Sequence, residues 1–182
     1  MQFLRLPENS DQKLSLAAEN VLTLYRWLQH LTPHLVIMPH PNDSNVTHQR
    51  VAMLYQRSVL HHAELLATSR SQQKNGPDSV AETAVEINPL VMFNRDAKTR
   101  AMQDNFVTPF EQPAADAKAR LLRLHESQQQ RNLEQRNIGF DERVLTMNRA
   151  LAERLGTASR YAESFDLAVA SLNSQQLRRN PR

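Results

Sequence analysis

The crowding of histidines is the first feature of this sequence that could do chemistry. His30, His34, His40, His48, His61 and His62 all lie within residues 30–62. Imidazole nitrogens bind zinc, iron and nickel. The chain has no cysteine, so a metal site would use nitrogen and oxygen ligands, and thiolate nucleophiles are excluded. We select His34, His40 and His61 as the candidate metal ligands.

The neighbouring residues His61 and His62 cannot easily serve the same ion. Side chains of adjacent residues point about 100° apart on a helix. His62 falls on the apolar stripe of its predicted helix, which is typical of a hydrogen-bonded core residue, whereas His61 shares a face with Glu64. The spacing of the histidines matches no ligand motif, so a metal-dependent enzyme that uses them is the third of three hypotheses.

Other catalytic signatures are absent. The segment from His125 to Gln129 resembles the helical zinc-protease motif, but glutamine stands where the second histidine is needed. No Gly-x-Ser-x-Gly elbow occurs. With only three glycines, the chain lacks the glycine-rich phosphate loops of nucleotide-binding folds. We therefore expect no cofactor.

Basic residues are concentrated in the last third of the chain. The formal net charge is +3, and residues 114–182 alone carry +4. This asymmetry supports a second hypothesis, a nucleic-acid-binding protein. However, acidic residues alternate with the arginines, as Arg149 and Glu153 illustrate, which is typical of a solvated helix face. The candidate phosphate contacts are Arg143, Arg149, Arg154, Arg160, Arg178, Arg179 and Arg182.

Apolar residues recurring every three or four positions predict the elements that must position these side chains. Long helices are expected over residues 10–31, 46–72, 114–136, 141–155 and 158–177, and a short one over 96–105. Residues 107–113 are expected to form a loop. The apolar run at 35–38 is predicted to be extended, and it could pair with 90–93 as a two-stranded patch.

These elements predict an all-α fold, a helical bundle of about four main helices plus short ones with an irregular middle. We expect one helical domain over residues 1–182. Its parts are an N-terminal arm (1–8), an irregular connector or lid (78–113) and a disordered tail (178–182). No apolar run is long enough to span a membrane and no signal peptide is recognisable, so we expect a cytoplasmic protein and no membrane partner.

The leading functional hypothesis follows from the absence of a recognisable catalytic motif in the predicted helices. We expect a non-enzymatic protein–protein interaction module, such as an adaptor, chaperone or effector-like protein, rather than an enzyme. Its partner would be another protein or a second copy of the chain. The Gln-, Asn-, Ser- and Arg-rich, glycine-poor composition loosely resembles that of bacterial or phage accessory proteins. Nucleic-acid binding and metal-dependent catalysis remain the alternatives.

Overall fold

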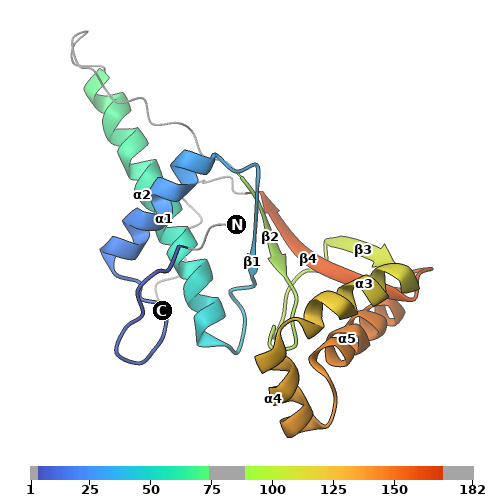
Figure 1. Cartoon of the computed structure of the whole chain (residues 1–182). Coiled ribbons are helices and arrows are strands. Elements are labelled where there is room, and N and C mark those ends of the chain that lie inside the picture. The colour runs from blue at the N-terminus through green and yellow to red at the C-terminus, as the bar shows by residue number, and fades with distance from the viewer. Residues whose placement is uncertain (1–3, 74–88, 170–182) are drawn as a thin grey trace. The chain divides into compact units, whose positions relative to one another are not determined.

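The computed structural model describes residues 4–73 and 89–169, with side chains from residue 66 to 73 and at 169 left out (Figure 1). The chain divides into two compact units. The first comprises residues Met1–Phe93 and Leu167–Arg182, and the second comprises Asn94–Asp166. No helix in the described ranges is long and apolar enough to cross a membrane.

Up to Asn94, the described residues of the first part of the chain form two helices and two short strands. They are α1 (Ala18–Leu31), β1 (Leu35–Pro39), α2 (Val46–Gln73) and β2 (Leu90–Asn94). All four contribute to one hydrophobic core, made of Leu28, Met38, Ala52, Tyr55, Val59 and Val91. Along β1 the side chains alternate as in a half-buried strand: Val36 and Met38 face this core, whereas Leu35 and Ile37 are exposed.

The strands β1 and β2 are neighbours that run parallel. The amide of Leu90, the first residue of β2, donates a hydrogen bond of 2.9 Å to the carbonyl of His34, directly before β1. Both strands therefore begin at the same edge of the sheet, and the helix α2 between them forms a β-α-β crossover. This connection places the end of β1 and the start of α2 together.

The second unit contains three helices and an antiparallel strand pair. They are β3 (Phe106–Phe110), α3 (Gln112–Arg123), α4 (Glu126–Arg136), α5 (Phe140–Leu155) and β4 (Tyr161–Val169), whose last three residues belong to the first unit. β3 pairs with β4 from Phe106 opposite Phe165 to Phe110 opposite Tyr161. Pro109 is tolerated because β3 is an edge strand.

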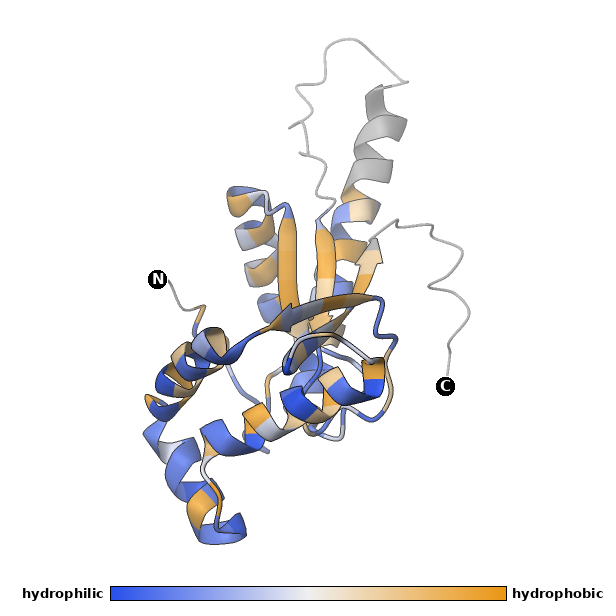
Figure 2. Cartoon of the chain, turned by 90° about the vertical axis from the view of Figure 1, so that its right-hand side faces the viewer, coloured by the Kyte–Doolittle hydropathy of each residue, from blue (hydrophilic) through white to orange (hydrophobic). Residues whose placement is uncertain are grey.

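The four strands form a sheet in the order β1-β2-β4-β3. Parallel pairing of β1 with β2 and antiparallel pairing of β3 with β4 make it a mixed sheet. In Figure 2 the strands are coloured mostly as hydrophobic, whereas the helices carry hydrophobic and hydrophilic residues side by side. The expected all-α helical bundle is therefore wrong, and the fold is α/β.

The largest error is the predicted helix over residues 158–177. Residues 161–169 are strand β4, and the remaining predicted residues from 170 onward lie outside the described ranges. Ala162 and Ser164 are two residues apart and are both buried, as side chains on one face of a strand can be. The apolar residues of this short segment fit the period of a helix as well as that of a strand. Its pairing with β3 makes it a strand.

Other expectations were met more closely. The patch formed by residues 35–38 and 90–93 is present as β1 and β2, and α2 and α5 begin and end within about two residues of their predicted bounds. The helix expected over 114–136 is interrupted at Leu124 and His125. Residues 96–105 form turns rather than a helix, and the expected loop at 107–113 contains most of β3 and the start of α3. Of the connector expected over 78–113, residues 78–88 lie outside the described residues, as does the tail expected over 178–182.

Candidate functional site

The turn that follows β1 carries two buried polar side chains. His40 is 8% exposed and Asp43 is 1% exposed, although both are polar. They lie at the carboxyl end of a strand in a parallel pair, the edge at which α/β sheets commonly bind ligands. A buried carboxylate must be compensated by hydrogen bonds or by a positive charge.

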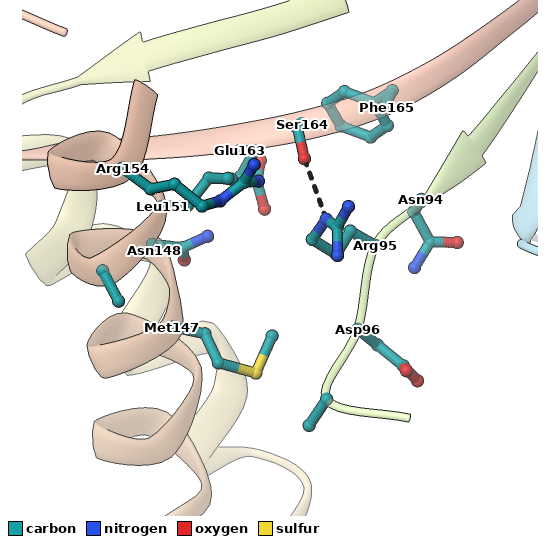
Figure 3. A pocket seen from close by; sticks show the side chains of 12 residues that line it. Asn94, Arg95, Asp96, Met147, Asn148, Leu151, Arg154, Glu163, Ser164 and Phe165 are labelled. Carbon is teal, nitrogen blue, oxygen red and sulfur yellow. Dashed lines mark hydrogen bonds between the residues drawn. The ribbon is translucent and has the colours of Figure 1, made fainter. Parts of the chain in front are cut away.

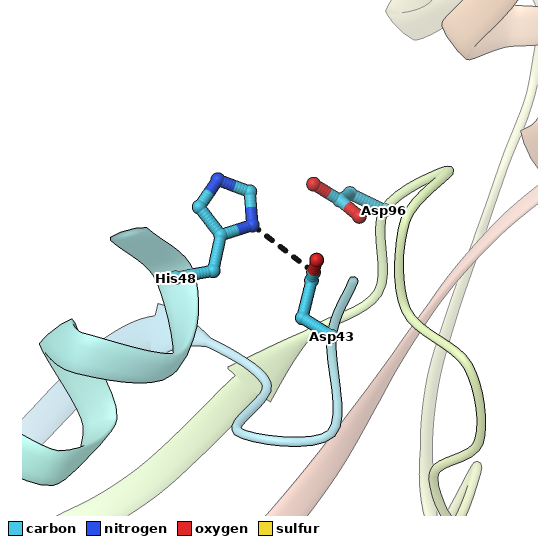
Figure 4. Close-up of side chains that lie close together, drawn as sticks. All are labelled: Asp43, His48 and Asp96. Carbon is cyan, nitrogen blue, oxygen red and sulfur yellow. Dashed lines mark hydrogen bonds and ion pairs between the residues drawn. The ribbon is translucent and has the colours of Figure 1, made fainter. Parts of the chain in front are cut away.

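The carboxylate of Asp43 is held from two directions within its own unit. Oδ1 accepts a hydrogen bond from the backbone amide of Asn45 at 2.6 Å, and Oδ2 lies 3.0 Å from Nδ1 of His48, in the first turn of α2 (Figure 4). The backbone carbonyl of Asp43 also accepts a bond of 2.6 Å from the side chain of Gln49. The turn is therefore tied to the start of α2 at several points.

Asn45 sets the start of α2. Its side-chain oxygen accepts a bond of 3.0 Å from the amide of Thr47, as a helix N-cap residue does. The helix begins at Val46, so His48 is in its first turn and points back toward the turn that carries Asp43 (Figure 4). Capping thus brings together a carboxylate and an imidazole that are five residues apart.

The contact with Asp43 determines the state of the His48 ring. A carboxylate accepts hydrogen bonds, so Nδ1 of His48 must carry the proton that it shares with Asp43. In the neutral ring the lone pair then lies on Nε2. A histidine oriented in this way by a carboxylate is found both among metal ligands and among general bases.

His40 has the opposite arrangement. Its Nδ1 accepts a hydrogen bond of 3.0 Å from the backbone amide of Asn42, so the neutral ring carries its proton on Nε2. The ring also contacts that of Phe93 edge to face, with centroids 5.5 Å apart. In this conformation Nε2 of His40 is a hydrogen-bond donor, and the ring binds a metal only after it gives up the contact with Asn42.

The three histidines selected from the sequence lie on different elements. His34 precedes β1, His40 follows it, and His61 lies on α2, where its ring meets that of Tyr25 edge to face at 5.1 Å. Metal binding by this set stays a prediction. His62 is buried, as expected from its place on the apolar stripe. His48 and Asp43 were not selected, although a carboxylate and a histidine on either side of a predicted N-cap were a usable signal.

The arginines proposed as phosphate contacts are used in several ways in the second unit. Arg143 donates to the side chain of Asn132 at 3.3 Å, and Arg154 pairs with Asp104 at 2.7 Å. Arg149 and Arg160 meet at the ring of Tyr161. Arg178, Arg179 and Arg182 lie outside the described residues. Nucleic-acid binding by the set stays a prediction.

A cavity of about 320 Å³ lies within the second unit, between the segment after β2, α5 and β4 (Figure 3). Met147, Leu151 and Phe165 form part of its lining. Its polar side is organised around Arg95 and Ser164, and Ser164 is buried. Such a cavity is at the small end of the range for ligand sites.

Asp104 neutralises the arginines beside this cavity. Its carboxylate accepts hydrogen bonds from Ser164 Oγ at 2.6 Å, Arg154 Nη2 at 2.7 Å and Arg95 Nε at 3.1 Å. Burial by itself raises the pKa of Asp104, but the hydrogen bonds from these three residues and the charge of Arg95 together lower it below its ordinary value. Asp104 is therefore a structural anion that holds the two arginines.

Comparison with known proteins gives one informative result. No family model matches the chain, and neither does any curated protein. Among solved structures, the chain is similar to N,N'-diacetylchitobiose deacetylase from Pyrococcus horikoshii, solved in complex with its inhibitor MPG. The TM-score is 0.57 and the sequence identity 19%, with 86% of this chain and 53% of that chain covered. The chain thus spans about half the length of that structure, and the likeness shows the fold.

This comparison corrects the leading functional hypothesis. A non-enzymatic interaction module was expected because a helical bundle without a catalytic signature usually acts through its surfaces. The premise fails, because the fold is an α/β fold shared with a deacetylase and not an all-α bundle. The polar pair of Asp43 and His48 at the end of a strand adds a candidate for metal binding that the bundle model did not contain. The expectation of a non-enzymatic module therefore no longer has the fold on which it depended.

Proposed function

We propose that this protein is a metal-dependent enzyme whose site is built on the turn between β1 and α2. The observation that carries the proposal is the pair formed by Asp43 and His48, a buried carboxylate bound to an imidazole at the carboxyl end of a parallel strand. Nitrogen and oxygen donors of this kind suit zinc, and three protein ligands are usual in catalytic zinc sites. A divalent cation held there would act as a Lewis acid toward a substrate carbonyl oxygen.

The residues of the turn have separate tasks in this proposal. His48 offers the lone pair on Nε2, because Asp43 fixes the proton on Nδ1. Asp43 keeps the ring oriented and supplies negative charge. If the ring of His40 turns away from Asn42, it joins the ligands, as the sequence predicted.

The similar solved structure suggests the reaction class. A deacetylase hydrolyses an N-acetyl amide, so that water and the amide yield acetate and a free amine. We extend this to the present chain as removal of an acetyl group from an N-acetylated amino sugar, supported by the shared fold. The cytoplasmic location expected from the sequence belongs to the same proposal.

The first test measures metal binding. The full chain would be stripped with a chelator, dialysed against zinc and analysed for bound metal by mass spectrometry. We expect about one equivalent per chain, with affinity reduced at least about tenfold in Asp43→Asn and His48→Gln. The asparagine side chain has one carbonyl oxygen where aspartate has two, so it cannot accept from both the Asn45 amide and Nδ1 of His48 as the carboxylate does. His30→Gln, an exposed histidine on α1, is the matched control.

Activity is then followed as acetate released from N,N'-diacetylchitobiose by the zinc-loaded protein. The proposal is supported if turnover requires metal, disappears in Asp43→Asn and is kept in His30→Gln. Zinc binding that is the same in all three variants would place the metal elsewhere, and absence of binding would overturn the proposal.

A further inference from the structure

An open basin of about 770 Å³ lies on the second unit, whereas the turn that carries Asp43 belongs to the first. It is lined by residues of α3, α4, α5 and the start of β4, all between Asn94 and Asp166. Its volume is within the range of small-molecule sites. The basin has no role in the proposed enzyme, so its side chains require a separate explanation.

Two arginines converge in this basin on one aromatic ring. The guanidinium carbons of Arg149 and Arg160 lie 5.5 Å and 5.6 Å from the ring centroid of Tyr161. Tyr161 is only 2% exposed and stacks on Phe110, with centroids 5.4 Å apart. A rigid, buried ring therefore holds both cationic groups, and cation–π contacts orient them.

Neutral groups complete the support of the two arginines. Arg160 Nη1 and the hydroxyl of Tyr161 each donate to Oε1 of Gln112 at 3.1 Å, and Arg149 Nη2 lies 3.5 Å from the Tyr161 oxygen. Among the described residues, no ion pair joins Arg149 or Arg160 to a carboxylate, in contrast to Arg95 and Arg154. Each guanidinium has five N–H donors, so most of this capacity is left for a ligand.

The acidic residues of the basin limit what it can bind. Asp141 is paired with Arg123 at 2.7 Å, whereas Asp116 and Glu142 also line the basin. These acidic side chains lower the net positive charge of the basin, so an anion would be held by direct contacts with Arg149 and Arg160 and not by a general positive potential. Guanidinium groups match the oxygens of phosphate in a bidentate arrangement.

We propose that Arg149 and Arg160 form a phosphate-binding site, with Tyr161 and Gln112 as positioning residues. The phosphate group belongs to a small phosphorylated compound or to a nucleic-acid backbone, and the site engages one or two phosphates at a time. It is independent of metal binding at the turn after β1. Of the arginines selected from the sequence, the structure singles out this pair.

The test uses the full chain and two probes at low salt, inorganic pyrophosphate and a single-stranded oligonucleotide of about 12 nucleotides, with binding measured by calorimetry. We expect Arg149→Gln and Arg160→Gln each to weaken binding about tenfold. Lysine at either position should weaken it less, because lysine keeps the charge but loses the planar fork. The matched control is Arg143→Gln, on the same helix as Arg149 but outside the basin, which should stay within about twofold of the parent.

The two probes distinguish the sources of phosphate. If the oligonucleotide binds, a plot of the logarithm of its association constant against the logarithm of the salt concentration should have a slope of about −1.4 for two phosphates. Each arginine substitution should reduce the magnitude of this slope by about 0.7. If only pyrophosphate binds, the ligand is a small phosphorylated compound. The proposal is overturned if neither probe binds, or if the glutamine and lysine variants bind as the Arg143→Gln control does. Circular dichroism and zinc content, unchanged in folded variants, would separate a binding defect from misfolding.

Discussion

Replacing Asp104 by asparagine tests whether the charge cluster beside the cavity of the second unit stabilises the fold. The carboxylate is 11% exposed and accepts bonds from Ser164, Arg95 and Arg154. Asparagine keeps the shape, but it presents only one acceptor oxygen and turns an amide toward guanidinium groups. Two arginines and a buried hydroxyl then lose their common partner.

The magnitude follows from the exposure of each partner. Arg95 is 24% exposed and makes two contacts, so its charge-assisted bonds contribute about 1.5–3 kcal/mol. Arg154 is 53% exposed, which limits its share to about 1 kcal/mol or less. The hydroxyl of Ser164 adds roughly 1 kcal/mol. We therefore expect Asp104→Asn to lower the free energy of unfolding by about 2.5–5 kcal/mol at pH 7.

The sign of the pH dependence gives an independent check. The pKa of Asp104 is lowered in the folded protein, so its contribution is complete above the unfolded value near 3.9 and is lost as the pH falls through the folded value. Urea unfolding of the parent and of Asp104→Asn should differ at pH 7 and converge below about pH 4. Glu134→Gln, an exposed change whose partner is Gln130, should have little effect. A difference under about 1 kcal/mol at pH 7, or one that persists unchanged at pH 3, would refute the reasoning.

Two further substitutions test packing within the second unit. Gly139→Ala would place a methyl group 2.5 Å from Oδ1 of Asp141, so we expect the contact between Gln129 and Asp141 to break at a cost of about 1–2 kcal/mol, measured by urea unfolding; an unchanged midpoint would contradict this. Lys118→Met would leave the buried side-chain oxygen of Asn148 without the lysine donor, and a loss of about 1–3 kcal/mol is expected in the same assay. A neutral or stabilising result would show that the lysine is dispensable for the fold.

Parts of this fold can be predicted from the sequence because their signals are local. Gly156 has a φ of 63° and ends α5, as a glycine after a helical stripe predicts. The apolar runs before Pro39 and after Pro89 could be predicted as a strand pair because each is a short apolar segment next to a proline. Strand β4 was not, because its identity depends on pairing with β3, more than 50 residues earlier in the chain.

The candidate site was missed for a related reason. The helix predicted to begin at residue 46 does begin there, and Asn45 caps it. A second consequence of this cap is that it turns the chain so that His48 reaches Asp43. A count of histidines cannot show this, because the partner of the relevant histidine is an aspartate whose burial appears only in the structure.

The carboxylates of Asp104 and Asp43 are compensated in different ways, and the difference points to function. Asp104 is held by two guanidinium groups that stay charged at every accessible pH, so its cluster needs no further cation. Asp43 forms its ion pair with a histidine, which is charged only when protonated. The proposed zinc ion, held by the Nε2 of His48 that Asp43 orients, would add a lasting positive charge to this pair. Zinc at about 100 times its dissociation constant should then raise the free energy of unfolding by about 2.7 kcal/mol, and this increase should be missing in Asp43→Asn.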